Sequence, residues 1–528
     1  MGLLSVLMRF SINIIKGCSE PLHKLERLPL RSFPLTRWAS EWLFLISLLF
    51  MSFQTAAQSK ISFDTLQNDL KGALQFLADV QCKETIEGKT YAGEWPAYMQ
   101  MHKRFVMLGT RQKYRDSNSF TTSGIYNLLS DVYLTDTSLT QILPMLRASF
   151  PEIQSYATEQ RYNFWKLLPP NRDLQKGPQP SPVPWVRRPT HYKLRSRYIN
   201  NAANVENDAD DTASGNLAEL YHGQIFGKEI GLSVESDSLS DFRGASERLL
   251  APFQLFDTYL DTLRDNRHWY NFLFNGCAHS GAFMTWLGQE ETFKKWSIVK
   301  TFGHNQIFYL KQSICYPKPY QPYIPYGTND VDAVVNANVL TYLSHKRELN
   351  LSKGTGGAHR FIYHQAVRKR WSRAGHYYPN RYHFHYAVSR ALVAGDTALL
   401  PTARLMLQHL MESQRLAGSY HSRRRVNHGD ELQSTTYALL ALLNFKKMGL
   451  NVAQSSLNRA VNFLLNQRQR IDNKVFWKGG VYFSGGTVVR NVLYFTSDAY
   501  TTALVAQALQ KYLILLQENP GQSITERD

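Results

Sequence analysis

The sequence contains few cysteines, and several well-known catalytic motifs are missing from it. Only four Cys occur in 528 residues. Neither GxSxG nor HExxH occurs, so serine-hydrolase and zinc-peptidase chemistry have no support. The glycine-rich segment GTGGAH from Gly354 lacks the Lys and the Ser or Thr of a phosphate-binding loop. These absences remove three well-marked enzyme classes.

Basic residues outnumber acidic ones, but they do not gather into one stripe. The formal net charge is +18, spread along the chain, so we do not expect nucleic acid as a partner. With 43% hydrophobic residues and no long low-complexity tract, the chain is globular. Aromatic residues make up 13%, with 29 Tyr and 10 Trp. Such a content suits a cleft lined by rings, which carbohydrates and isoprenoids both bind.

The N-terminus carries the pattern of a targeting segment. Arg27 to Arg37 is basic, Trp42 to Phe53 is an apolar run, and small residues near Ala57 suit cleavage. The apolar run is shorter than the ~20 residues that span a membrane, although an anchor is the alternative. We therefore predict a signal peptide or membrane anchor over residues 1–57. The protein is then exported to the periplasm or the medium, or associates with the membrane through this segment.

The cysteines that remain after such cleavage allow one disulfide. Cys18 would leave with the signal. Cys277 and Cys315 could pair in an oxidising compartment and leave Cys82 free. Three buried free thiols are the alternative, and the sequence does not decide between the two.

From about residue 58 onward the pattern is helical. Six runs are apolar or small on nearly every side and follow a polar or acidic start, so each must be buried among other helices. Amphipathic segments lie between them. This alternation predicts an all-α fold over residues 58–528, an α/α toroid in which about six inner helices are wrapped by about six outer ones. The six runs begin at Asp116, Asn207, Asn329, Tyr377, Gly429 and Ser497.

The links between these segments predict loops and small hairpins at one end of the ring. The proline-rich stretch from Pro169 to Pro189 indicates a loop. KTYAGEWPAY from Lys89 and KGGVYFSGG from Lys478 indicate turns or hairpins.

The acidic start DADDTA, from Asp208 to Ala213, resembles the DxDDTA motif of class II terpenoid cyclases such as squalene-hopene cyclase. The preceding segment from Trp185 is loosely similar to the approach to that motif. The motif match covers six residues, and the toroid-like pattern covers most of the chain. The resemblance therefore points to the superfamily of terpenoid cyclases and protein prenyltransferases, whose catalytic domains are α/α toroids.

This resemblance implies acid-initiated chemistry on an isoprenoid-type substrate. Asp210 would donate the proton, while Asp208 and Asp211 tune it, because three neighbouring carboxyls cannot all ionise cheaply. Asp330 and Asp332 repeat the D-x-D spacing at the same ring opening and join the catalytic candidates. Aromatic side chains would stabilise positive charge through their π-faces. The candidates near the starts of inner helices are Trp95, Phe120, Tyr323 and Tyr326.

Glycan-active enzymes with an α/α barrel are the alternative, and a non-catalytic toroid that binds a glycan or another ligand is a third hypothesis. A hydrolase needs two carboxyls about 5 to 9.5 Å apart, so Asp210 would pair with Asp330, Asp332 or Glu94. A lyase acting on an acidic glycan would use a Tyr or His base, for which His383 in YHFHY is a candidate.

Calcium binding and helix capping are two further interpretations of the acidic start. Its acceptor side chains alternate as in an EF-hand loop, although Ala213 stands where that loop needs Gly. Apart from this Ca²⁺ hypothesis we expect no cofactor. Capping of a helix start explains one of the three carboxylates, but not all three. The calcium hypothesis rests on Asp208, Asp210, Thr212, Ser214, Asn216 and Glu219.

Overall fold

The chain divides into two units, Met1–Lys60 and Ile61–Asp528, and the computed structural model describes residues of the second. The predicted signal segment and the predicted Cys277–Cys315 pair lie outside the described residues, so both stay predictions. No helix in the described part is long and apolar enough to cross a membrane. The described residues are 62–102, 112–169, 181–190, 203–227, 250–263, 279–288, 322, 324, 329–422, 430–486 and 491–518.

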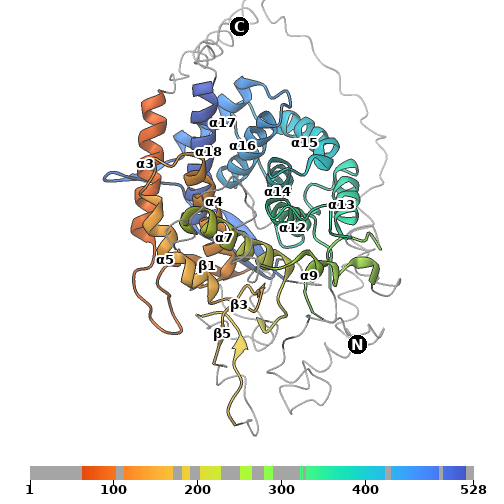
Figure 1. Cartoon of the computed structure of the whole chain (residues 1–528). Coiled ribbons are helices and arrows are strands. Elements are labelled where there is room, and N and C mark those ends of the chain that lie inside the picture. The colour runs from red at the N-terminus through yellow and green to blue at the C-terminus, as the bar shows by residue number, and fades with distance from the viewer. Residues whose placement is uncertain are drawn as a thin grey trace, which may run out of the picture. The chain divides into compact units, whose positions relative to one another are not determined.

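Six inner helices form a closed ring within this part of the chain (Figure 1). Each packs against the next in sequence order, and the last returns to the first. They are the six runs that the sequence marks as apolar on nearly every side, so the prediction of an α/α toroid is confirmed. The inner helices are α4 (Ser119–Thr135), α7 (Ala209–Phe226), α12 (Ala333–His345), α14 (Arg381–Val393), α16 (Glu431–Lys447) and α18 (Asp498–Glu518).

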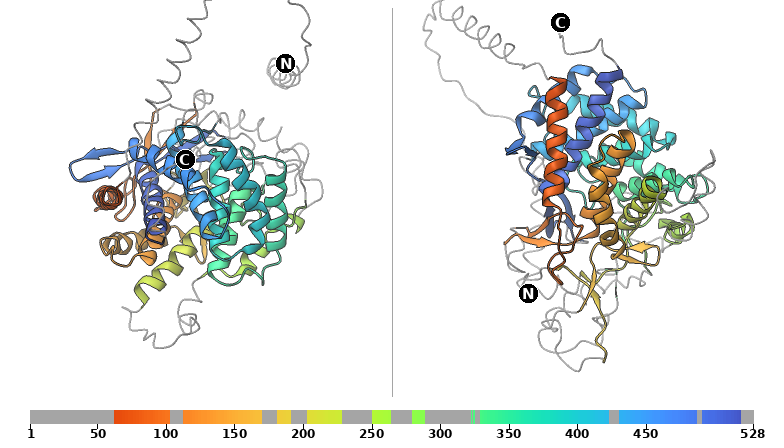
Figure 2. Two further views of the ribbon diagram at one scale, coloured as in Figure 1. Left: turned by 90° about the horizontal axis from the view of Figure 1, so that it is seen from above. Right: turned by 60° about the vertical axis from the view of Figure 1, so that its left-hand side comes forward.

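Outer helices cover this ring (Figures 1 and 2). The first packs on α18, the second on α4, the third on α12, the fourth on α14 and α16, and the fifth on α16. One face of each is buried, as their amphipathic patterns predict. In order, they are α3 (Phe63–Val80), α5 (Ile142–Gln154), α13 (Thr355–Val367), α15 (Leu400–Ser413) and α17 (Gln454–Asn466).

Two outer segments differ from the expectation. The apolar stretch 247–263 contains, in its described portion, only the short helix α9 (Phe253–Asp257) and a 3-10 turn, Asp261–Leu263. Conversely, the GTGGAH segment opens helix α13. Its glycines allow close packing, because a Cβ on Gly357 would lie 2.0 Å from the backbone oxygen of Gly281. A second 3-10 turn, Thr397–Leu399, precedes α15.

A small antiparallel sheet joins the start of this unit to its end. Its strand order is β2-β1-β10-β9, with Met99 opposite Phe495. Strands β2 and β10 lead directly into α4 and α18, which helps to close the ring. Both expected hairpin segments contribute strands to it. The strands are β1 (Ala97–Met101), β2 (Tyr114–Asp116), β9 (Val481–Gly485) and β10 (Leu493–Thr496).

Three two-stranded hairpins complete the described strands. The third projects from the region of α3, where Phe76 stacks on Phe476 with ring centroids 4.8 Å apart. The hairpins are β3 (Ala157–Thr158) with β4 (Arg161–Tyr162), β5 (Leu167–Leu168) with β6 (Val186–Arg187), and β7 (Gln469–Ile471) with β8 (Lys474–Phe476).

Polar caps begin the inner helices. In five of them the side chain of the N-cap residue accepts a hydrogen bond from a backbone N–H of the first turn, and at α18 the Ser497 hydroxyl accepts from the Tyr500 N–H at 3.1 Å. Such caps satisfy donors that the helix itself leaves unpaired. The five N-caps are Asn118, Asp208, Asp332, Asn380 and Asp430.

Candidate active site

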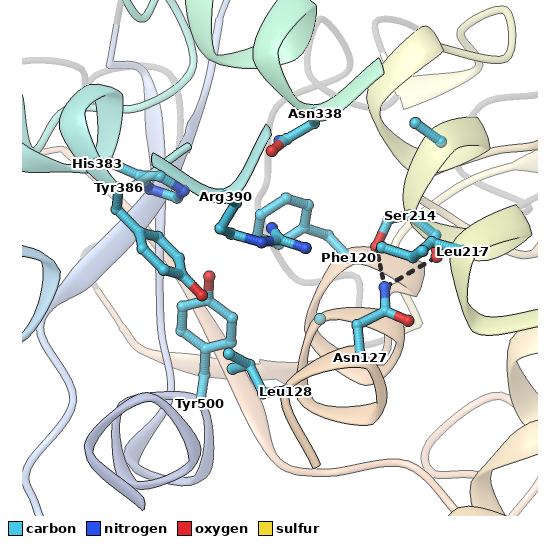
Figure 3. Close-up of a pocket in the computed structure, with 12 residues that line it drawn as sticks. Phe120, Asn127, Leu128, Ser214, Leu217, Asn338, His383, Tyr386, Arg390 and Tyr500 are labelled. Atoms are coloured by element: carbon cyan, nitrogen blue, oxygen red, sulfur yellow. Dashed lines mark hydrogen bonds between the residues drawn. The ribbon is translucent and has the colours of Figure 1, made fainter. Parts of the chain in front are cut away.

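Two pockets lie along the axis of the ring. The first is lined mainly from the first halves of the inner helices and the second mainly from their second halves, so the inner helices run parallel. Leu128 and Arg390 line both pockets. The first pocket (Figure 3) is lined by residues that include Phe120, Asn127, Leu128, Ser214, Asn338, His383, Tyr386, Arg390 and Tyr500.

Both pockets are small. They hold about 30 and 70 Å³ of water-accessible space, respectively. At ~10–15 Å³ for each water molecule, this is room for only a few waters. A substrate larger than a few water molecules can therefore bind only if side chains move away from the ring axis.

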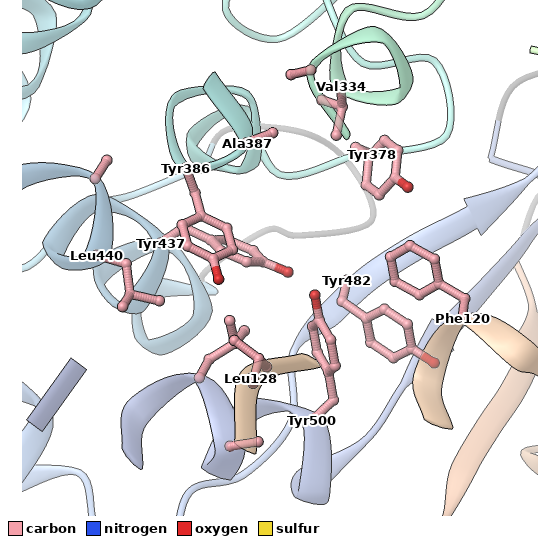
Figure 4. Packing of buried hydrophobic residues seen from close by; sticks show 14 of the residues in the cluster. Phe120, Leu128, Val334, Tyr378, Tyr386, Ala387, Tyr437, Leu440, Tyr482 and Tyr500 are labelled. Carbon is pink, nitrogen blue, oxygen red and sulfur yellow. The ribbon is translucent and has the colours of Figure 1, made fainter. Parts of the chain in front are cut away.

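Aromatic side chains pack together beside the first pocket (Figure 4), and three of them, Phe120, Tyr386 and Tyr500, line it. Phe120 stacks on Tyr482 with ring centroids 5.9 Å apart, and Tyr482 lies 4.6 Å from the Tyr500 ring. From α14, Tyr386 stacks on Tyr437 at 5.7 Å. The aromatic rings that line the pocket thus come from α4, α14 and α18, and rings of β9 and α16 pack against them.

The Asp210 carboxyl lies at the start of α7 and is hydrogen-bonded by the neighbouring inner helix. Asn338 of α12, which lines the first pocket, donates from Nδ2 to Asp210 Oδ1 at 2.7 Å. Asp210 is 5% exposed. Asp210 itself lines neither pocket, but its side chain is engaged by a pocket-lining residue of another inner helix rather than by the backbone of its own helix.

Asp208 and Asp211 form a separate pair. Asp208 is the N-cap of α7, and its Oδ1 accepts from the Asp211 backbone N–H at 2.7 Å. The two carboxyls influence each other's ionisation, and the Ser119 hydroxyl at the start of α4 favours the ionised form of Asp211. Capping thus accounts for Asp208, as the helix-start interpretation expects.

Burial raises the pKa of all three of these carboxyls. Burial and the neighbouring charge of Asp208 raise the pKa of Asp210 well above its ordinary value, outweighing the Asn338 hydrogen bond. Burial and Asp208 likewise raise the pKa of Asp211. Burial raises the pKa of Asp208 to about 6, while hydrogen bonds from Asp211 oppose that rise. Asp208 ionises first, and Asp210 remains an acid beside the pocket.

Asp330 and Asp332 have different surroundings near the start of α12. Asp332 Oδ1 accepts from the backbone N–H groups of Val334 at 2.7 Å and Val335 at 3.2 Å. Its Oδ2 accepts from the backbone N–H groups of the residues at 376 and 377. Burial and the charge of Asp330 raise the pKa of Asp332 to about 6. With four backbone donors on one carboxylate, its geometry is that of a structural cap.

Replacing Asp332 by Ala should therefore destabilise the fold. The loss of a cap and of acceptors for buried N–H groups should lower the free energy of unfolding by at least about 2 kcal/mol. Urea unfolding of the purified protein measures this. The exposed Asp64→Ala in the first turn of α3 is the control, with a change within about 0.5 kcal/mol. Equal stability of both variants would contradict the capping role.

The remaining predicted substrate-binding residues fall into three groups. Phe120 and His383 line the first pocket, and burial lowers the pKa of His383 to about 3, so its imidazole is neutral. Glu94 and Trp95 do not line either pocket: Glu94 pairs with Arg115 at 2.9 Å, and Trp95 is a core residue whose Nε1 donates to a backbone oxygen of α3. Tyr323 and Tyr326 lie outside the described residues.

The structure corrects the calcium hypothesis. An EF-hand ligand set needs a loop wrapped around the ion, but these residues lie on helix α7 and its cap, where alternate side chains point in different directions. Ser214 Oγ lies 2.8 Å from the Ser123 hydroxyl of α4, and Glu219 accepts from the Tyr162 hydroxyl at 2.9 Å. No group of three or more His, Cys, Asp or Glu that could hold a metal occurs among the described residues.

Several pocket residues were not among the sequence candidates. Asn338, Tyr386, Arg390 and Tyr500 come from three inner helices and meet at the ring axis. Arg390 could have been found from the sequence, because an Arg is unusual in a helix that is otherwise buried on nearly every side and therefore suggests a functional role. The other three are ordinary in sequence.

These features define the class of the protein as an α/α toroid with a buried acidic site beside an axial pocket. No protein-family model matches the sequence, and no curated protein matches it. Among solved structures, the chain is similar to the type II terpene cyclase MstE from Scytonema, at 14% identity and a TM-score of 0.44, over 85% of this chain and 99% of that one.

Two carbohydrate-related structures are similar to the same degree. A possible GH105 family member from Klebsiella pneumoniae shares 10% identity at a TM-score of 0.43, over 93% of this chain and 100% of that one. Cellobiose 2-epimerase from Bacillus thermoamylovorans also shares 10% at 0.43, over 86% and 99%. Such low values select no reaction, and the description of the fold rests on the helix ring itself.

Proposed function

We propose that this protein is an enzyme that uses Asp210 as a general acid, in an acid-initiated reaction of the class II terpenoid cyclase type on an isoprenoid-type substrate. The observation that carries the proposal is the position of Asp210. Its carboxyl is buried, has a pKa well above the ordinary value because of burial and the charge of Asp208, and is hydrogen-bonded by a residue of the pocket wall. The DADDTA motif supports the same assignment.

The proposed step transfers the Asp210 proton to an alkene carbon of the substrate. The π electrons form the new C–H bond and leave a cation on the neighbouring carbon, while Asp210 becomes a carboxylate. The Asn338 amide stabilises that carboxylate by its hydrogen bond. The rings of Phe120, Tyr386 and Tyr500 offer π-faces to the cation. Ring closure and loss of a proton then yield an isomer of the substrate.

A glycan-active enzyme is the second candidate, favoured by another buried carboxyl near α12. Asp330 Oδ2 accepts from the Tyr377 hydroxyl at 2.8 Å, and His376 Nε2 lies 3.7 Å away. In a hydrolase, Asp210 would protonate the glycosidic oxygen and Asp330 would act as nucleophile or base. Asp332 is a poorer partner because its carboxylate is committed to backbone donors.

Product mass in D₂O tests the two reactions. Wild-type protein should convert geranylgeranoic acid into cyclic isomers that gain one deuterium on carbon, because the initiating proton comes from an exchangeable carboxyl. Mass spectrometry of the product measures this gain, and protein-free incubation is the control. Digalacturonate offered in parallel would instead gain the elements of water if the enzyme is a hydrolase. Hydrolysis without any isoprenoid turnover would reject the cyclase reaction in favour of the second candidate.

A further inference from the structure

Arg390, a partly exposed residue of α14, lies at the ring axis, and no carboxylate among the described residues forms an ion pair with it. Its side chain lines both pockets and points into the space that the labelled residues surround in Figure 3. The nearest aromatic face is that of Tyr386, with the guanidinium carbon 5.6 Å from the ring centroid. Within the described part of the chain, Arg390 forms no ion pair. The helical pattern around residue 390 predicts an apolar or small side chain there, not a guanidinium.

Asp131 attracts the Arg390 guanidinium electrostatically, but it forms its ion pair with another cation. Its Oδ2 lies 3.1 Å from the Lys511 ammonium and accepts from Gln507 at 2.7 Å. The two histidines that line the pockets do not change this balance of charge. Burial lowers the pKa of His345 to about 4 and that of His383 to about 3, so both are neutral. One positive charge is left over at the ring axis.

An uncompensated guanidinium in this position is costly for the fold and unsuited to the proposed chemistry. Charges inside proteins are normally paired, because desolvation of an unpaired charge is expensive. A fixed cation would also repel a carbocation formed between the aromatic rings of the first pocket. Both problems disappear if the ligand brings its own negative charge to Arg390.

We propose that the ring binds a ligand with an anionic group, a carboxylate or a phosphate, and that Arg390 holds this group between the two pockets. A guanidinium can donate two parallel hydrogen bonds to either group. The unsaturated body of the ligand would then lie in the first pocket, within reach of Asp210. This last step rests on the proposed function, whereas the recognition of the anion does not. An acidic glycan also carries carboxylate groups, so the experiment includes both an isoprenoid acid and an acidic glycan.

Binding of matched probes tests the inference without requiring turnover. Geranylgeranoic acid and geranylgeraniol share one chain and differ in charge; digalacturonate and its methyl ester form a second pair. By titration calorimetry, wild type should bind the acid of one pair at least about tenfold more tightly than its neutral partner. Arg390→Gln should remove that preference, and Arg390→Lys should keep part of it. The control Arg404→Gln, an exposed cation on α15, should keep all of it.

Each outcome of this binding experiment either supports or overturns the inference about Arg390. Equal affinity for the acid and neutral members, a preference that survives in Arg390→Gln, or no binding of either acid would overturn the inference. If Arg390→Gln fails to fold by circular dichroism, the wild-type pair and Arg390→Lys carry the comparison. Arg390-dependent binding of geranylgeranoic acid without product would leave this inference standing and reject the proposed reaction. Preference confined to digalacturonate would assign the anion to a glycan.

Discussion

Asp210→Asn should lower kcat by about 10²- to 10⁴-fold while the fold is retained. The acid in the proposed reaction must hold its proton until the substrate arrives, and burial together with Asp208 gives Asp210 that property. Asparagine has the same shape but no acidic proton. Because burial favours the neutral form of the wild-type carboxyl, the neutral amide removes the chemistry with little change to the electrostatics of the core.

Steady-state turnover of the substrate identified by product mass measures this loss. Asp430→Asn is a matched control, since Asp430 is a buried carboxyl at the start of another inner helix, burial raises its pKa to about 7, and its Oδ1 accepts from the Gln433 backbone N–H rather than from a pocket residue. Asn is itself a good cap, so this variant should turn over like wild type. Full activity in Asp210→Asn, with the control also active, would remove Asp210 from the role of acid.

The ring itself could be predicted because each of its inner helices has a recognisable pattern within its own stretch of sequence. A helix such as α16, apolar on nearly every side, has no stable place except between other helices. Its polar start then becomes the cap. Helix α13 escaped prediction because its glycines normally indicate a loop, and only the close approach of Gly357 to Gly281 explains them.

The site could be predicted only in part, for a different reason. Asp210 stands out because three carboxyls exceed what capping needs. Its partner Asn338 lies 128 positions later in the chain and is ordinary in sequence, so only the closed ring brings the two together. The same holds for Arg390 and Tyr500, which come from α14 and α18. Glu94, by contrast, was a candidate partner for Asp210 in a hydrolase, but its carboxylate forms an ion pair with Arg115.

The second large effect is on stability as a function of pH. In the unfolded chain Asp210 ionises at its ordinary pKa, whereas in the folded protein burial and Asp208 raise that pKa well above it. Between the two values the folded state holds the extra proton, so the stability that it provides is lost as pH rises. The loss amounts to at most about 1.4 kcal/mol per pH unit for one such group. Asp210→Asn has no ionisable group at this position, so it does not lose stability in this way.

The free energy of unfolding of Asp210→Asn, relative to wild type, should therefore increase from pH 5 to pH 8. Urea unfolding at each pH measures it, and buried histidines affect both proteins alike, so they cancel in the difference. Asp131→Asn should behave in the opposite way. Burial would raise the pKa of Asp131, but Lys511 holds it below its ordinary value, so this variant loses stability at neutral pH and recovers relative to wild type in acid. A pH-independent difference for Asp210→Asn would mean an ordinary carboxyl, and an ordinary carboxyl could not serve as the proposed acid.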